Sequence, residues 1–286
     1  MRVQTQDKIA TGVFYTIAAL ITIILGSILA FIFIKGIGGI SLDFLTSESE
    51  NMRAGGGIGP QLFNSFYLLF LTMLITIPIG VGGGIYMSEF AKDNLFTNFA
   101  RLVIEVLSSL PSIVVGLFGL LILVQKLGLG FSIISGAIAL TIFNLPLMIR
   151  ITEQALQTVP RNQKEASLAM GVTHFDTIIY VMLPIALPSI TTGIILAAGR
   201  VFGEAAALMY TAGMSAPPLN VQNALNPFRP AETLAVHIWK VNAEGLAPDS
   251  MQIVASASLV LVVGVLLFNI LSRILGKKLQ RKLSGN

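Results

Sequence analysis

Long charge-free stretches, separated by short polar segments, dominate the hydrophobic pattern of this chain. They cover residues 9–34, 54–88, 106–125, 127–149, 177–199 and 250–272, and the fifth continues through residue 205 with two charges inside it. Each stretch reaches the roughly 20 residues that a helix needs to cross the hydrocarbon core of a bilayer. The pattern therefore predicts an all-α integral membrane protein with six transmembrane helices.

The composition supports this prediction. Of the 286 residues, 54% are hydrophobic and 11% are charged, with a mean hydropathy of +0.82, whereas soluble domains carry about 25% charged residues. The chain has no cysteine, which excludes disulfides and thiolate metal sites. Its two histidines, His174 and His237, are too few for a histidine metal cluster.

The basic residues predict the orientation. Six spans place both termini on one side, and with the termini inside, 12 Lys and Arg fall on the inner side against 5 on the outer side. Because inner loops of membrane proteins are enriched in Lys and Arg, both termini are expected in the cytoplasm. The basic tail, residues 276–286, is then a cytoplasmic anchor. It lacks the interleaved aromatic residues of a nucleic-acid surface, so no nucleic-acid partner is expected.

Two ionisable residues interrupt the fifth span. Arg200 and Glu204 are four residues apart, so a continuous helix would place them on one face, with Arg200 near the membrane midplane. Charges at that depth usually face a partner, a cavity or a substrate path, and the planar guanidinium matches phosphate oxygens. The pair therefore indicates an anion path; the alternative is a structural ion pair between helices. Gly199 and Gly203 would permit close approach of another helix.

Other polar residues of the spans are weaker candidates for the same path. Ser109 and Ser112 flank Pro111 and can present hydroxyls to an anion, although donation to their own helix carbonyls is an equally good account. Asn144, beside Pro146, is a candidate cavity residue. The Gly-rich run at residues 80–84 matches no nucleotide-binding motif and predicts close helix packing.

The segment between the fourth and fifth spans, residues 150–185, has its own helical signals. Pro160 suits the start of a helix, and residues 161–170 are a helical run. Gly171 suits the left-handed position that follows a helix. Thr173 and Asp176 form a capping pattern that opens the next helix. The sequence predicts a short surface helix that packs against a partner, because an isolated helix of this length is marginal in water.

This segment carries a family resemblance. Glu165-Ala166-Ser167, three residues, Gly171, nine residues, Val181-Met182-Leu183-Pro184 resembles the EAA loop of ABC-transporter permeases, which reads Glu-Ala-Ala-x3-Gly-x9-Ile-x-Leu-Pro. The resemblance implies the type I permease fold and a coupling helix that docks on a cytoplasmic ATPase. It also implies that ATP and magnesium are bound by that ATPase, so that this chain binds no cofactor and is not itself an enzyme.

The rest of the chain narrows the resemblance. Residues 57–60, 85–90, 105–119, 199–206 and 210–213 look like the second permease subunit of phosphate-specific ABC importers; the alternatives are the sister permease subunit or an importer of another small oxyanion. The implied partners are a second permease, an ATPase dimer, an extracytoplasmic phosphate-binding protein, the lipid bilayer and phosphate. The implied location is the cytoplasmic membrane of a bacterium or archaeon, as a multi-pass protein.

The expected organisation has three parts. Residues 1–59 form the first span and an outer loop, residues 60–275 form the permease core, and residues 276–286 form the tail. The outer segment, residues 212–249, is either a docking surface or an ordinary interfacial loop. A secondary transporter would have no reason for an EAA loop, and a membrane-embedded enzyme would need a nucleophile–base set or metal cluster that the two histidines do not supply.

Overall fold

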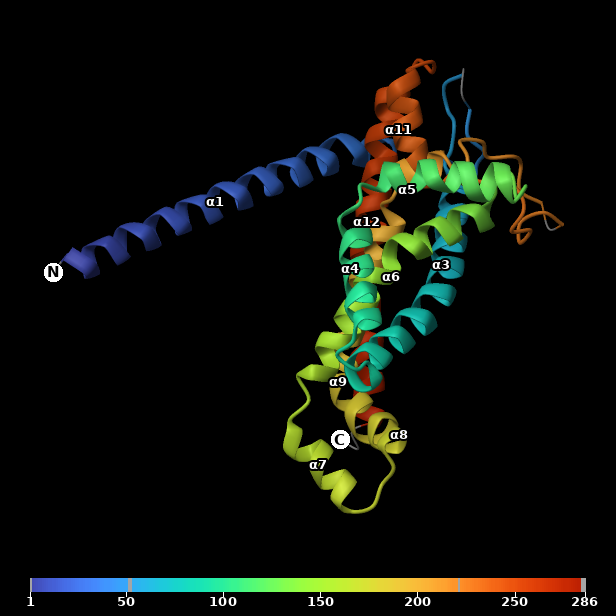
Figure 1. The fold of residues 1–286 in the computed structure, drawn as a ribbon. Helices are drawn as coiled ribbons and strands as arrows, with labels where there is room; N and C mark the ends of the chain where they lie inside the picture. Colours follow the sequence, from blue (N-terminus) through green and yellow to red (C-terminus); the bar gives the residue numbers. More distant parts are fainter. Residues whose placement is uncertain (1, 51–52, 221, 284–286) are drawn as a thin grey trace.

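The computed structural model describes residues 2–50, 53–220 and 222–283, and within these ranges the chain forms helices and loops without any strand (Figure 1). The long helices are α1 (Arg2–Gly36), α3 (Gly59–Ile85), α6 (Ile133–Gln157), α9 (Leu183–Phe202) and α12 (Ser250–Leu283). The shorter α-helices are α2 (Leu42–Thr46), α4 (Leu95–Ser109), α5 (Ser112–Gly119), α7 (Arg161–Ala169), α8 (His174–Thr177), α10 (Ala206–Met209) and α11 (Leu234–Glu244). π-Helical turns cover Tyr86–Phe90, Leu120–Lys126 and Ile178–Met182, and a 3₁₀ turn covers Ile37–Gly39. The predicted all-α fold is confirmed.

In the described part of the chain, five helical segments are long and apolar enough to cross a membrane. They are Gln6–Gly39, Gly59–Phe90, Ile133–Gln157, His174–Phe202 and Ser250–Ile274. A sixth span forms only if two successive helical segments, Leu95–Ser109 and Ser112–Lys126, are taken together, and these are bent by 103°. Leu110 and Pro111 have extended backbones at the bend, because proline cannot donate to the helix and disfavours helical conformation before it.

Two predicted boundaries were wrong, and the last helix continues beyond its apolar stretch. The third span is not one straight helix over residues 106–125 but the bent pair just described. The fifth ends at Phe202 rather than continuing through residue 205. The last span continues as α12 to Leu283, so the basic tail extends that helix, and residues 284–286 lie outside the described residues.

α1 stands away from the other helices over most of its length and meets them only at its C-terminal end (Figure 1). There the Ser256 hydroxyl on α12 donates 2.9 Å to the Gly36 carbonyl, and Gln252 donates to the Lys35 carbonyl. A Cβ at Gly36 would lie 2.6 Å from the Ala255 carbonyl oxygen. This junction therefore depends on a small residue where α1 crosses α12.

The core of the bundle is the contact between α3 and α6. A Cβ at Gly80 would lie 2.5 Å from the Met148 Cβ, and one at Gly84 would overlap Thr152. The glycines therefore let the two backbones approach closely, as the sequence predicted for this run. Around this contact a large apolar cluster forms, which includes Leu68, Met73, Leu140, Met148, Val201 and Phe202.

The bundle has two ends. α7 and α8 lie at one end, and α11 lies at the opposite end beside the start of α12 (Figure 1). We refer to them as the α7 end and the α11 end. Because α3 begins at the α11 end and finishes at the α7 end, it is in contact with polar groups at both.

Gly84 and Gly82 provide a matched test of the α3–α6 contact. We expect Gly84→Ala to lower the free energy of unfolding by about 1–3 kcal/mol, because the new methyl group overpacks the interface. Gly82 has no atom within 4 Å of a built Cβ, so Gly82→Ala should stabilise by about 0.5–1 kcal/mol through backbone entropy. Thermal unfolding of the purified protein in detergent measures both changes, and a shift of the same sign in the two variants would contradict this packing.

Candidate functional site

Arg200 lies in the last turn of α9 and is half-buried. Its Cζ atom is 3.6 Å from the centre of the Phe143 ring on α6, a cation–π contact. Among the residues that the structure describes, none accepts a hydrogen bond from Arg200 or pairs with its charge. The ring covers a face of the guanidinium, whereas the five N–H donors lie in its plane. The donors therefore remain available to an anion.

Glu204 does not lie on the same helix as Arg200, as the sequence had suggested. α9 ends at Phe202, and the Glu204 side chain accepts a hydrogen bond of 3.2 Å from the Ala207 amide at the start of α10. No ion pair joins Arg200 and Glu204 within the described residues. Each charge instead sits at the helix end that favours it, the cation at a C-terminus and the carboxylate at an N-terminus.

The glycine pair beside Arg200 is also different from the prediction. A Cβ at Gly199 would have only the Asn269 Oδ1 atom within 4 Å outside its own helix, at 3.9 Å, and Gly203 is exposed. No described helix therefore packs closely on this pair. Asn269 on α12 was not identified from the sequence, although a lone amide in an apolar span is a recognisable signal. Its Oδ1 is buried without a hydrogen-bond partner.

Of the two serines at the bend, Ser109 makes the bond to its own helix that was the alternative to anion binding. The Ser109 hydroxyl donates 2.8 Å to the Val106 carbonyl of its own helix, and that residue is exposed. Ser112 is half-buried at the start of α5. α5 packs on α10 through glycines: a Cβ at Gly116 would lie 2.8 Å from the Ala207 Cα. The bend thus brings α5, which begins at Ser112, into contact with α10.

Asn144 is fully buried on α6, next to the Phe143 that contacts Arg200. Its Nδ2 donates 2.9 Å to the Leu140 carbonyl, and its Oδ1 has no partner among the described residues. A buried amide oxygen without a donor is unfavourable in an apolar surrounding. Asn144 is therefore a buried polar group of α6, next in sequence to the residue whose ring contacts Arg200.

The EAA-like segment has the local geometry that its sequence predicts. Gly171 has φ +82°, a left-handed conformation that favours glycine. The Asp176 amide donates 3.1 Å to the Thr173 hydroxyl, which confirms the predicted cap. α7 begins immediately after Pro160, and Pro184 lies in the first turn of α9.

None of the residues of α7 is buried. Glu165 and Ala166 are exposed, while the half-buried Ser167 is 3.0 Å from the Thr177 hydroxyl. Large apolar side chains around Gly171 are also exposed, namely Leu168, Met170, Val172 and Phe175. The segment therefore presents an uncovered, partly apolar surface at the α7 end.

Two ion pairs at the α7 end were not identified from the sequence. Glu89 accepts from Lys164 of α7 at 2.5 Å and lies 3.5 Å from the His174 Nε2 atom. Arg101 of α4 pairs with Glu153 of α6 at 2.6 Å. The partners are 75 and 52 residues apart in the chain, so no local pattern reveals them.

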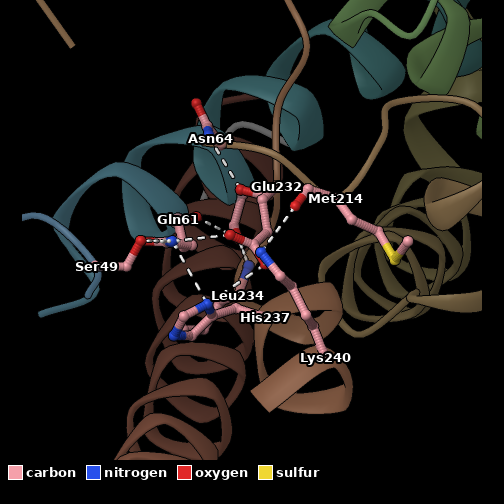
Figure 2. A network of polar contacts seen from close by, with 9 residues as sticks. Ser49, Gln61, Asn64, Met214, Glu232, Leu234, His237 and Lys240 are labelled. Carbon is pink, nitrogen blue, oxygen red and sulfur yellow. Dashed lines mark hydrogen bonds and ion pairs between the residues drawn. The ribbon is translucent and has the colours of Figure 1, made fainter. Parts of the chain in front are cut away.

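A buried polar network was also missed at the α11 end (Figure 2). Its centre is Glu232, whose side chain is 1% exposed. Gln61 of α3 donates 3.0 Å to one carboxylate oxygen, and the other lies 3.4 Å from the His237 Nδ1 atom and 3.6 Å from the Lys240 ammonium. The Asn64 amide donates 3.0 Å to the Glu232 carbonyl. The network fastens the start of α3 to α11.

The neighbours of Glu232 favour its charged form although the side chain is buried. Burial alone would raise the pKa of Glu232, but hydrogen bonds from His237 and Gln61 and the charge of Lys240 hold it below its ordinary value. The guanidinium of Arg229 donates 2.6 Å to the Asn64 Oδ1 atom. Among the described residues, no group of three His, Asp or Glu side chains is arranged to hold a metal ion.

Comparison with known proteins identifies the chain's relatives. Residues 80–285 match the family described as binding-protein-dependent transport system inner membrane component. The chain is 55% identical to the probable ABC transporter permease protein YqgI of Bacillus subtilis, with 98% of each chain covered. It is 35% identical to the phosphate transport system permease protein PstA of Xylella fastidiosa, covering 84% of this chain and 82% of PstA.

Solved structures support the same fold. A chain of a bacterial alginate ABC transporter, solved with an alginate pentasaccharide-bound periplasmic protein, has a TM-score of 0.70 at 13% identity, covering 97% of this chain and 96% of that one. A chain of the MetNI methionine ABC transporter in an inward-facing conformation has a TM-score of 0.57 at 18% identity, covering 77% and 93%. At these identities the likeness concerns the fold alone.

The Glu232 network makes a prediction about stability. We expect Glu232→Gln to lower the free energy of unfolding by about 3 kcal/mol at neutral pH, because it leaves the Lys240 ammonium without its counter-charge. The pKa of Glu232 is lower in the folded protein than its ordinary value of 4.5. The ionised side chain therefore stabilises the fold at pH values above 4.5, and this contribution is lost as the pH falls through the folded-state pKa. The difference between wild type and variant in thermal unfolding should therefore shrink below about pH 4.5.

Glu244 provides the control, since it is an exposed acid at the end of α11, the helix that follows Glu232. Glu244→Gln should change the unfolding temperature little at either pH. If the two variants behaved alike, Glu232 would not have the stabilising role assigned to it.

Proposed function

The chain belongs to the family of binding-protein-dependent transport system inner membrane components, the permease subunits of ABC importers, and we propose that it forms half of the path for inorganic phosphate. Membership makes it a multi-span membrane protein without ATPase activity of its own. The choice of phosphate rests on the PstA relatives, 32–35% identical, and on the free guanidinium of Arg200. The latter is the observation that carries the proposal.

Arg200 suits a phosphate oxyanion for a geometric reason. The Phe143 ring occupies a face of the guanidinium, which fixes its plane and leaves the edge donors for ligand oxygens. Two parallel N–H groups can then bind two phosphate oxygens, and such charge-assisted bonds are roughly twice as strong as neutral ones. Because Glu204 is held by α10 rather than by Arg200, the cation does not first have to be released from an ion pair.

Glu204 can contribute selectivity. An ionised carboxylate only accepts hydrogen bonds, so it attracts the protonated oxygen of hydrogen phosphate and repels fully deprotonated sulfate. One Glu204 oxygen is used by the Ala207 amide, and the other can serve this purpose. Asn144, Ser112 and Ser109 remain lesser candidates: Asn144 is buried, Ser112 is half-buried and Ser109 is exposed.

The α7 end is the proposed docking site for the ATPase. α7 is short, exposed and flanked by uncovered apolar side chains, and such a helix requires a partner surface. Glu165, Ala166 and Ser167 would contact the ATPase, Gly171 would provide the turn, and Leu183 with Pro184 would start the following span. ATP and magnesium would be bound by a PstB-like ATPase dimer, and no cofactor by this chain.

The remaining partners follow from the same proposal. A PstC-like second permease would complete the path, and a PstS-like phosphate-binding protein would dock outside. With both termini in the cytoplasm, the α11 end faces outward, and residues 212–249 provide its exposed surface with Phe228 and Trp239. The location is the cytoplasmic membrane, bacterial or archaeal.

Uptake by the reconstituted complex tests the substrate. Phosphate should accumulate in proteoliposomes only with ATP and the binding protein, whereas sulfate should not. Accumulation of sulfate in preference to phosphate would show that the substrate is a different oxyanion.

Arg200 provides a sharper prediction. Arg200→Gln should lower phosphate uptake at least about tenfold, because charge-assisted hydrogen bonds are lost, while the complex still assembles. Arg200→Lys should retain part of the uptake, since it keeps the charge and loses the fork. Arg273→Gln, at an exposed arginine on α12, serves as the control and should transport normally. Wild-type uptake by Arg200→Gln would remove Arg200 from the path.

Gly171 tests the docking segment. A Cβ here would touch nothing within 4 Å, but φ is +82°, so only the backbone conformation limits substitution. Gly171→Val should uncouple ATP hydrolysis from uptake, because a β-branched residue disfavours the left-handed conformation. Gly171→Asn, which tolerates that conformation, should retain coupling. Equal uptake per ATP in the two variants would contradict the coupling-segment assignment.

A further inference from the structure

We propose that Glu89 is the positioning residue through which a displacement of α7 reaches the transmembrane helices. The proposal rests on the proposed function, in which α7 docks on the ATPase. It adds the connection between that helix and α3. Glu89 lies in the π-helical turn Tyr86–Phe90 at the end of α3.

The first observation is how weakly α7 is held otherwise. It has no buried residue, and among the described residues only two of its side chains form hydrogen bonds or ion pairs with other elements. Ser167 contacts Thr177 of α8 at 3.0 Å, which is still within the EAA-like segment. Lys164 contacts Glu89 at 2.5 Å. The Lys164–Glu89 pair is therefore the direct side-chain link from α7 to α3 in the part of the chain that the structure describes.

The second observation is that Glu89 holds both sides of the Gly171 turn. Lys164 precedes the turn on α7, and His174 follows it on α8 at 3.5 Å from the same carboxylate oxygen. The His174 ring also packs edge-on against Phe90, with centroids 5.4 Å apart. The Glu89 side chain is only 5% exposed, so water competes weakly for its charge. The residues on both sides of the Gly171 turn thus contact the same carboxylate, that of Glu89.

The third observation is where the π-helical turn leads. The Arg101 guanidinium on α4 lies 3.5 Å from the Met87 carbonyl in this turn and pairs at 2.6 Å with Glu153 of α6. α3 itself packs tightly on α6 through Gly80 and Gly84. A force applied at Glu89 therefore reaches α3 directly and α4 and α6 through Arg101. π-Helical turns are frequent at functional sites. Here the turn ends α3 and contacts Arg101, which connects it to α4 and α6.

Three variants of the complete, reconstituted complex test the proposal. Glu89→Lys and Lys164→Glu should each lower the phosphate taken up per ATP hydrolysed by about fivefold or more, while the ATPase stays bound. The double variant Glu89→Lys with Lys164→Glu should recover most of that ratio, because the pair is restored with reversed charges. Asp93→Asn removes an exposed acid four residues away and should change nothing. If Glu89 had only a structural role, its replacement would change the amount of assembled complex but not the phosphate taken up per ATP hydrolysed.

A cross-link tests the connection more directly. The chain has no cysteine, so Glu89→Cys with Lys164→Cys introduces the only two thiols in this chain. The reduced form should be uncoupled, and bridging the thiols with a short, reductant-cleavable reagent should restore coupling, because the two elements are expected to move together. Restoration supports the proposal. A reduced form that is already coupled, or a bridged form that stays uncoupled, would overturn it.

Glu165→Lys distinguishes failure of this proposal from failure of the proposed docking of α7 on the ATPase. If Glu165→Lys uncouples the complex and Glu89→Lys does not, α7 docks on the ATPase but Glu89 is not the connection. If neither variant affects coupling, the docking assignment fails, and the role of Glu89 fails with it. Either result overturns the proposal, and the two results identify different errors.

Discussion

The close contact of α3 with α6 at Gly80 and Gly84 is the constraint on which the other features depend. Glycine at these positions removes the side chains that would hold the backbones apart. The contact fixes α6, and α6 carries the Phe143 ring under Arg200 and the Glu153 carboxylate beside Arg101. It equally fixes α3, whose two ends carry Gln61 and Glu89. A shift of one helix along the other would therefore change the Arg200–Phe143 contact and the polar contacts at both ends of α3 together.

The charges within this protein are stabilised by different means according to depth. At the two ends, acids and bases pair directly, as Glu89 does with Lys164 and Glu232 with Lys240. At the break between α9 and α10, the cation and the acid are instead placed at helix ends of suitable polarity. Helix-end stabilisation leaves hydrogen-bonding atoms free for a ligand, whereas an ion pair uses them. This difference is consistent with a structural role at the ends and a binding role at the break.

The sequence predicted features that depend on neighbouring residues. Hydrophobic length predicted six spans, and five of them are single segments long and apolar enough to cross a membrane in the described part of the chain. The pattern around Gly171 and Thr173 predicted the turn and the cap of the EAA-like segment. It did not predict the 103° bend, because a proline in a span can kink a helix slightly or break it, and packing of α5 on α10 decides which. It misplaced Glu204, because Gly203 ends α9 before the acid. Glu89 and Glu232 were missed, since their partners are brought close only by the tertiary fold.

The Glu232 network also determines the order in which the protein can be assembled. Gln61 and Glu232 are 171 residues apart in the chain, and translation at about 5–20 residues per second separates their synthesis by roughly 10–35 s. During that interval α3 is already made, and Gln61 and Asn64 have no acid, arginine or carbonyl of the later segment to bind. Until that segment is made, the start of α3 lacks the polar partners that hold it in the complete fold. Completion of the fold is thereby tied to synthesis of the last third of the chain.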